Sequence, residues 1–546
     1  MSNDAATVLE DASSSHRVYI GDSIGCLRVV QCDPPSALPA DFAGPSVRPL
    51  ILPNFKSHSD QAVQRLATGV LGDDVFVVAM ARRNATIDVV QVVNQTLPSS
   101  QPSTSAAPAP ASELRANVLC TIRETHMKAG IQRFIGLAVG TDGIYSITSS
   151  GVFRFTPITI TRSGEGDDDV AAELGEPRVL QTLPSPLQHA SFCPASDPTH
   201  FCYGGEDVPL SLWHVATAVS DAPAAHADAA ADMSVESIRA DEAGLNSKQR
   251  KRKRQLEAKS KARELLWGEV WRAKNLPNDN LSLPRRANIT ATCILSLQAR
   301  SDADEARGTE EAGGVNEQTF IAVGTKDGLV RVFQPGAASR RHVREARVVP
   351  SGQGSVKTLC ASTAALDSRT GGVLFVGDTG SKLYALDWQT CAVVYSYNGM
   401  AQVGAVLGMA VLPTGNAEAE ALVSVSSDSL MRLHTTVPAA VAVPKQGESG
   451  AKGKVVWEKM IARATGQSVH ATPTAAAWDG VVPAKIGSAG GQDDAVWENM
   501  QQVRSRANKK HDPNNDDDDE EDEESESEEE PTTRKPTRSG AKKPRS

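Results

Sequence analysis

The sequence has few aromatic residues, no zinc-binding cysteine pattern and no long apolar run. Phe, Trp and Tyr make up 4% of the 546 residues, and the eight cysteines include no C-x-x-C pair. We therefore expect buried, reduced thiols and neither a metal nor a cofactor. No apolar run approaches the roughly 20 residues that cross a bilayer, and the polar start, residues 1–17, does not resemble a secretory signal. These absences predict a soluble intracellular protein with no membrane contact.

Sequence patterns typical of catalysis are also absent. The chain contains no Walker-type loop, no G-x-S-x-G elbow and no H-E-x-x-H helix. Its eleven histidines are scattered, and we interpret His189, His200 and His214 as ordinary strand residues and not as ligands. We expect a non-enzymatic protein without a small-molecule substrate, although a carboxylate pair assembled by folding would leave no such pattern.

Charge is distributed very unevenly along the chain. The net charge is -10, but residues 516–530 alone contain thirteen acids and no base. The rest of the chain is therefore close to neutral, and self-repulsion should keep the acidic run disordered. Ser525 and Ser527 lie inside this run, each followed three residues later by Glu, which makes them candidate sites for an acid-directed kinase.

One local pattern recurs seven times. Each copy is a short β-type run, a turn containing Gly, Asp or Ser, and a second run with alternating apolar residues. We attribute the Gly and Asp of these copies to the positive-φ corners of tight hairpins. Because one hairpin cannot bury its apolar face alone, a repeated hairpin predicts stacked neighbours. The copies are residues 18–30, 75–93, 136–148, 200–215, 320–333, 373–387 and 421–434.

Further strand-like segments lie between the copies, at residues 116–125, 289–297, 355–361 and 405–412. Two extra strands and one hairpin make a four-stranded sheet, which is one propeller blade. The sequence thus predicts an all-β fold, a seven-bladed WD40-like β-propeller; a pair of β-sandwiches is the competing fold. Residues 454–459 and 467–471 are expected to complete the first blade.

These features define the expected domain organisation. Residues 1–475 form the propeller, interrupted by a Pro/Ser/Ala-rich loop at 96–112 and a long insert at 218–267. Residues 476–546 form a disordered tail with a short Trp motif at 495–500, the acidic run and a basic end.

The insert contains a strongly basic segment. Three interpretations of it remain open: a solvated charged helix, a nuclear-import signal, and contact with nucleic-acid phosphates. The last two do not exclude each other, and no aromatic platform for base recognition accompanies the segment. Its candidate import and RNA-contact residues are Lys248, Arg250, Lys251, Arg252, Lys253 and Arg254.

The segment that follows carries a family resemblance. Residues 271–283 read W-R-A-K-N-L-P-N-D-N-L-S-L. They resemble the signature W-x-A-K-N-V-x-N-D-x-L-D-L of the Nop-seven-associated WD-repeat family of ribosome assembly factors, with Ser282 in place of the usual acid and Leu276 in place of a β-branched residue. Residues 373–383, 424–434 and 495–500 are similar to further family motifs, whereas Ser427 and Ser429 depart from them.

The resemblance implies a function that composition does not show. Members of this family act in the nucleolus on precursors of the large ribosomal subunit (pre-60S), beside other assembly factors and rRNA, and a AAA-type ATPase removes them. The implied role is a scaffold in ribosome biogenesis and rRNA processing. A generic WD40 propeller scaffold in a chromatin or ubiquitin-ligase complex is the alternative, and an enzyme comes third.

Two interpretations of the motif residues stay open. Trp271, Leu281 and Leu283 are expected to pack as the first strand of a blade, because large apolar residues are usually buried. The polar members either build turns or contact a partner. The candidate partner surface comprises Trp271, Lys274, Asn275, Asn278 and Asp279.

Overall fold

The computed structural model describes residues 16–480 apart from short gaps, and the chain divides into two units, Met1–Ala484 and Lys485–Ser546. All described residues belong to the first unit, so the expected tail from residue 481 onward and most of the two expected inserts lie outside them. The gaps are residues 34, 36–37, 39–41, 43, 54, 73, 97–111, 163–169, 221–264, 279, 283–284, 298–313, 363–371, 398–403, 414–419, 439–450 and 462–470.

The described residues form seven antiparallel sheets, which we call blades 1 to 7. From the inner strand outward, blade 1 consists of β29 (Pro473–Trp478), β1 (His16–Asp22), β2 (Leu27–Cys32) and β3 (Val47–Leu50). Blade 2 consists of β4 (Val63–Leu71), β5 (Val75–Arg82), β6 (Thr86–Thr96) and β7 (Ser112–Arg123). Blade 3 consists of β8 (Phe134–Gly140), β9 (Gly143–Thr148) and β10 (Phe153–Arg162), and both β11 (Val170–Leu174) and β12 (Arg178–Leu180) pair with β10.

Blades 4 to 7 follow the same order. Blade 4 consists of β13 (Leu187–Cys193), β14 (His200–Gly205), β15 (Ser211–His214) and β16 (Glu269–Arg272), and blade 5 of β17 (Ile289–Ser296), β18 (Phe320–Thr325), β19 (Leu329–Phe333) and β20 (Arg344–Arg347). Blade 6 consists of β21 (Val356–Ala361), β22 (Val373–Asp378), β23 (Leu383–Asp387) and β24 (Ala392–Ser396). Blade 7 consists of β25 (Val406–Pro413), β26 (Glu420–Ser426), β27 (Leu430–Thr435) and β28 (Val455–Met460).

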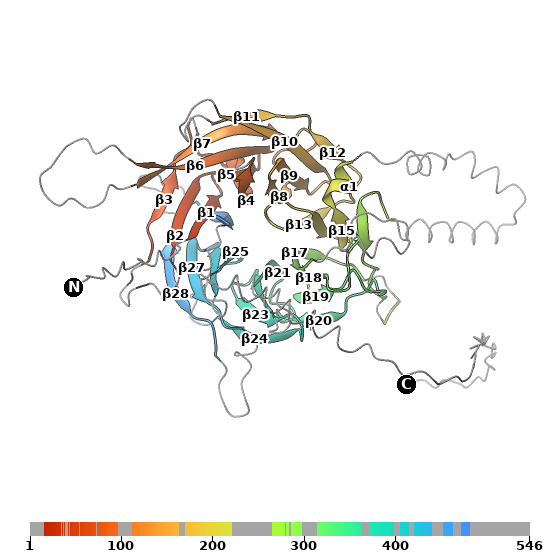
Figure 1. Cartoon of the computed structure of the whole chain (residues 1–546). Coiled ribbons are helices and arrows are strands. Elements are labelled where there is room, and N and C mark those ends of the chain that lie inside the picture. Colours follow the sequence, from red (N-terminus) through yellow and green to blue (C-terminus); the bar gives the residue numbers. More distant parts are fainter. Residues whose placement is uncertain are drawn as a thin grey trace, which may run out of the picture. The chain divides into compact units, whose positions relative to one another are not determined.

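The blades follow one another around a ring, with the first strand of each blade nearest the centre (Figure 1). The seven-bladed β-propeller predicted from the hairpin repeat is therefore confirmed, and the pair of β-sandwiches is wrong. Helices are minor: the described residues contain α1 (Val215–Val219) and a 3-10 turn at Ser59–Gln61. No helix in this part of the chain is long and apolar enough to cross a membrane.

All seven predicted hairpins are pairs of neighbouring antiparallel strands, but one is displaced within its blade. Six copies supply the second and third strands of a blade. The copy at residues 136–148 supplies β8 and β9, the first and second strands of blade 3. Its turn at residues 140–143 therefore lies at the opposite end of the blade from the other six turns.

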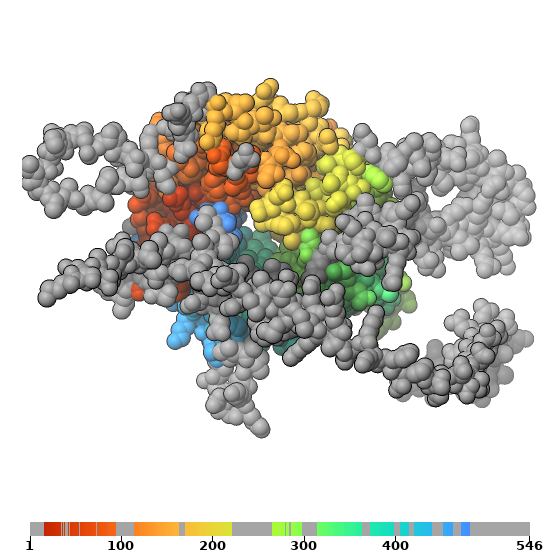
Figure 2. Space-filling model, viewed as in Figure 1, coloured from red at the N-terminus to blue at the C-terminus, as the bar shows by residue number. Residues whose placement is uncertain are grey.

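The ring closes differently from the sequence expectation. The inner strand of blade 1 is β29, which pairs with β1 from the other end of the sequence. In the space-filling view this C-terminal segment, in blue, lies against the N-terminal blade, in red (Figure 2). Residues 454–459 do form a strand, β28, but it is the outer strand of blade 7. The closing strand begins at Pro473, after the segment 467–471, and runs past the expected domain boundary at 475.

Each inner strand has one bulge near its start. In every blade one residue near the start of the inner strand is skipped in the pairing with the second strand, and β17 skips a further residue, Leu295, near its end. A bulge residue has no paired residue opposite it in the neighbouring strand. Beyond the bulge, the side chains that faced one side of the sheet face the other side. The seven residues skipped near the strand starts are Gln64, Ile135, Gln188, Thr290, Lys357, Leu407 and Thr474.

Some bulge residues bridge to the next blade. Thr474 donates its hydroxyl to the carbonyl oxygen of Val63, at 2.6 Å, and Thr290 makes the same bond to Val356. The Gln64 amide oxygen accepts from the backbone N–H of Phe134 at 2.8 Å. The bulge thus places a polar side chain where it joins consecutive blades.

Four glycines of the predicted hairpins are needed for a different structural reason from the expected one. Gly21, Gly204, Gly324 and Gly377 lie in second strands, and none has a positive φ. A Cβ at these positions would lie 2.2–2.8 Å from the first residue of the next blade's inner strand: Val63, Ile289, Val356 and Val406, respectively. These glycines are required by the close approach of neighbouring blades, and their attribution to positive-φ corners is corrected.

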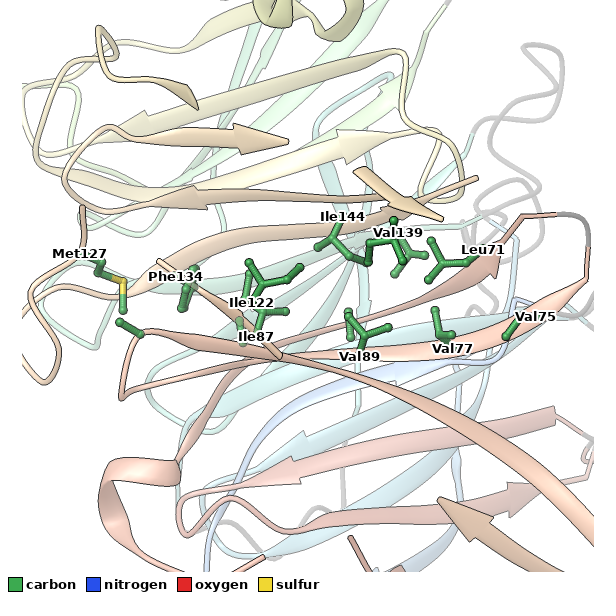
Figure 3. Close-up of a cluster of buried hydrophobic side chains, with 14 residues drawn as sticks. Leu71, Val75, Val77, Ile87, Val89, Ile122, Met127, Phe134, Val139 and Ile144 are labelled. Carbon is green, nitrogen blue, oxygen red and sulfur yellow. The ribbon is translucent and has the colours of Figure 1, made fainter. Parts of the chain in front are cut away.

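Apolar side chains fill the spaces between blades. One cluster joins blades 2 and 3 and includes Val77 and Val89 on one side and Phe134 and Ile144 on the other (Figure 3). All eight cysteines are free thiols. Cys32 and Cys202 are buried, whereas the other six, which were also expected to be buried, are partly buried. The core is therefore made of contacts between neighbouring sheets, and each blade depends on both neighbours.

Substitution of Gly324 tests this packing. The G324A Cβ would lie 2.2 Å from Cγ1 of Val356, so we expect a loss of about 1–3 kcal/mol in the free energy of unfolding. V356A removes the obstructing methyl groups, and the double variant should lose less than the sum of the two single losses. Urea denaturation measures all three variants. Strictly additive losses would show that the contact between these two residues is not the cause.

Acid should destabilise the fold through a buried histidine. Burial, and then the charge of Arg432, lowers the pKa of His434 from 6.5 to about 3. The unfolded chain takes up a proton near pH 6.5 and the folded chain does not, so stability present above that pH is lost as the pH falls toward 3. We expect a slope of about 1.4 kcal/mol per pH unit from this residue. Denaturation at graded pH measures it, and H434F should show a shallower slope.

Candidate interaction surface

The predicted basic and phosphorylation residues lie outside the described residues. After blade 4 and α1, the described part of the chain extends to Ser220, and the description begins again at Leu265. Lys248 and Arg250–Arg254 fall within this gap, and Ser525 and Ser527 lie in the second unit. They keep the status of sequence predictions. The family motif at 271–283, in contrast, is described except for Asp279 and Leu283.

A buried carboxylate fixes the chain as it leaves the insert. Glu269, the first residue of β16, accepts from the backbone N–H of Leu266 at 3.1 Å and from Nε of Arg272 at 2.6 Å. The Arg272 guanidinium binds the second carboxylate oxygen as well, and Ser211 donates its hydroxyl to Glu269. The hydrogen bonds that Arg272 donates to Glu269 raise the pKa of Arg272. This network holds the start of the motif in one geometry.

Trp271 belongs to the core. Its side chain is 6% exposed and packs edge-on against Phe333 of blade 5, with ring centroids 5.9 Å apart. Leu210, Leu212 and Ile289 complete the surrounding apolar cluster. The structure therefore places this member of the candidate partner surface in the interior, where it joins blades 4 and 5. Its burial agrees with the packing expectation, but Trp271 lies in the outer strand of blade 4 and not in the first strand of a blade.

Beyond Trp271 the chain crosses from the outer edge of blade 4 to the inner strand of blade 5; we call residues 273–288 the crossing segment. Its start is fixed by backbone bonds from Ala273 N to Leu210 O at 2.8 Å and from Lys274 N to Arg340 O at 2.7 Å. Arg340 also donates Nε to the carbonyl of Arg272 at 2.6 Å. At the far end Lys326 N donates to Asn288 O at 3.0 Å. Both ends of the segment are thus anchored.

The polar motif residues project from this segment. Lys274, Asn275 and Asn278 are exposed, and none forms a side-chain hydrogen bond or ion pair with the residues that the structure describes. Leu281, expected to pack in a strand, is 78% exposed. That expectation is wrong because β16 ends at Arg272 and the chain then passes over the surface. An amide, an ammonium and an apolar side chain are all available here for contact with another molecule.

A second group of polar residues was not found from the sequence. Arg65 and His189 follow the bulges of β4 and β13, Lys357 is the bulge residue of β21, and Arg133 immediately precedes β8. We call these four residues the axial basic cluster, because they lie at one level of the inner strands. An alternation rule cannot identify them, because each bulge reverses which side chains face the ring centre. His189, interpreted as an ordinary strand residue, belongs to this group.

Mutual repulsion and burial set the electrostatics of the cluster. Burial lowers the pKa of Arg65 to about 10, with a further contribution from Arg133. Burial, then Arg133 and Arg65, lowers the pKa of Lys357. The pKa of His189 lies well below its usual value, again through burial first and then the three cations. Its Nδ1 accepts from the backbone N–H of Thr292 at 3.2 Å, which places the ring proton on Nε2.

The described part of the chain offers no evident metal site. These residues contain no set of three His, Cys, Asp or Glu side chains that could hold a metal ion. Burial raises the pKa values of Cys120 and Cys193 to about 11, which disfavours the reactive thiolate. The chemistry that the surface offers is hydrogen bonding and charge.

The carboxylate at the base of the motif should be important for stability. The Glu269 side chain is fully buried beside Arg272, which is 23% exposed, so E269A should cost about 3 kcal/mol by leaving a charge uncompensated. Glu458 pairs with Arg432 but is 50% exposed, so the control variant E458A should cost less than about 1 kcal/mol. Equal losses in urea denaturation would contradict a special role for Glu269.

No protein-family model matches the sequence, and no curated protein matches it. Among solved structures, the chain is similar to Sqt1 of Chaetomium thermophilum bound to the N-terminus of the ribosomal protein L10, with 12% identity, a TM-score of 0.38 and coverage of 76% of this chain and 80% of that chain. Sqt1 of Saccharomyces cerevisiae gives 8% identity, a TM-score of 0.39 and coverage of 76% and 79%. Similarity at this level carries no conclusion about the function of this chain.

Proposed function

We propose that this protein is a non-enzymatic scaffold of ribosome biogenesis that docks on nucleolar precursors of the large subunit. The observation that supports the proposal is that some residues of the family-like motif are buried in the fold whereas others are exposed. Trp271 serves the fold, whereas Lys274, Asn275 and Asn278 are exposed and make no side-chain hydrogen bond to the described residues. Residues that neither fill the core nor tie a turn are free to bind a partner.

The anchoring of the crossing segment supports a docking role. Both of its ends are held by backbone hydrogen bonds to blades 4 and 5, and the Glu269 network fixes the strand that precedes it. Side chains presented from fixed backbone lose little conformational entropy on binding. A partner would therefore meet a preformed surface.

The basic segment of the insert is the basis for proposing a nuclear location of the protein. Lys251–Arg254 would act as a nuclear-import signal, and the same charges, with Lys248 and Arg250, would contact rRNA phosphates in the particle. Removal by a AAA-type ATPase is the further step that the family resemblance implies. In this proposal the protein holds a place on the pre-60S particle until its release.

Tagged purification from gradient-separated lysate tests the proposal. The wild type should recover large-subunit precursor rRNA with nucleolar assembly factors from heavy fractions. K274A/N275A/N278A should reduce that recovery about tenfold, the effect of losing about 1.4 kcal/mol of contacts. The control D327A/Q353A/K382A changes three exposed residues of blades 5 and 6 that the crossing segment does not use, and should leave the recovery unchanged.

The outcomes separate the two functions considered. Wild-type protein confined to light fractions without rRNA would contradict the proposal and favour the generic propeller scaffold. Equal recovery by both triple variants would leave particle binding intact but show that the crossing segment is not the docking surface. A fluorescent fusion lacking residues 247–264 tests import separately and should lose its nuclear accumulation.

A further inference from the structure

The axial basic cluster brings together cations from separate blades. Arg65, Lys357 and Arg133 come from blades 2, 6 and the approach to blade 3, and each pair of them interacts electrostatically. Each cation lies far from the others in sequence, so only closure of the ring makes them neighbours. Like charges brought together destabilise the fold unless something neutralises them.

The cluster is held in a defined geometry. Arg65 donates Nε to the carbonyl oxygen of Ile135 at 3.0 Å. The backbone N–H of Arg133 donates to the Ser149 hydroxyl at 3.1 Å, and its guanidinium binds the side-chain amide of Gln188. These contacts use only part of the donors that two guanidinium groups carry. The remaining N–H groups stay available in a fixed arrangement.

No described acid neutralises this charge. None of the three cations forms an ion pair with a carboxylate in the described ranges, whereas Arg28, Arg82, Arg331 and Arg432 of the same propeller all do. Burial already lowers the pKa of Arg65 and of Lys357. Lys357 and Arg133 are nevertheless exposed enough to be reached from solvent. The arrangement matches a site for an anionic group from outside.

We propose that the axial basic cluster binds carboxylate side chains of an acidic, partly apolar peptide segment of a partner protein. The apolar part is indicated by the surroundings. Ile131 is 84% exposed and lies two residues before Arg133 in the same connection. A carboxylate would enter between the cations while apolar side chains of the same peptide cover Ile131.

The same surroundings disfavour RNA as the occupant. Proteins that bind single-stranded nucleic acid combine a basic groove with aromatic side chains on which bases stack. The large apolar side chains exposed in the described part of the chain are all aliphatic or methionine. Cations gathered around one point also differ from the extended basic track that successive phosphates require.

Fluorescence anisotropy with the full-length chain tests the site. The probe is a labelled peptide of alternating Glu and Leu, compared with its Gln–Leu counterpart and with a labelled single-stranded RNA. R65Q/R133Q/K357Q removes the cluster, and the control R83Q/K326Q/K382Q removes three exposed charges from hairpin turns at the same end of the blades. Both variants keep the basic insert and the acidic run and differ equally from the wild type in net charge.

We expect the cluster variant to lose about tenfold or more in affinity for the Glu–Leu peptide, and the control variant to stay close to the wild type. Added salt should weaken the wild-type complex. The single variant K357Q changes an exposed side chain, so it should fold normally and show a partial loss. Equal affinities of the two triple variants, or a loss confined to RNA, would overturn the proposal. The assay uses purified protein, so its outcome is independent of particle recovery.

Discussion

The whole ring depends on the contact between the second strand of one blade and the first residue of the next blade's inner strand. At four such contacts a glycine gives Val or Ile room to approach, and a Cβ would lie within 2.8 Å of it. At the bulge beside them, Thr290 and Thr474 hydrogen-bond to the backbone of the next blade. Each blade is therefore positioned by its neighbour, and β29 makes the last contact that closes the circle.

This dependence explains how much of the fold the sequence revealed. The hairpins were recognisable because alternation and turn residues are local, and seven of them sufficed for the blade number. The closing strand was not recognisable, because Pro473–Trp478 is a strand only by pairing with β1 at the other end of the chain. The hairpin at residues 136–148 was expected to resemble the other six, although it forms the first and second strands of blade 3. The reason is the same, because strand order within a sheet is not a local property of the sequence.

The candidate surface shows the same limit. The motif at 271–283 could be located from the sequence, but its division into buried Trp271 and exposed Leu281 could not, because it depends on β16 ending at Arg272. The axial basic cluster left no local pattern. Arg65, His189 and Lys357 are separated by long stretches of chain, and the bulges shift their faces against the alternation.

The bulges that join the blades also contribute to the axial basic cluster, whose charge no described acid neutralises. A bulge residue has no partner opposite, so its side chain is available either for a bridge, as in Thr290, or for an external ligand, as proposed for Lys357. A threonine in place of Lys357 could only bridge, and the charge would be lost. The repeated backbone feature thus supports stability in some blades and recognition in others, and side-chain chemistry at one position decides between them.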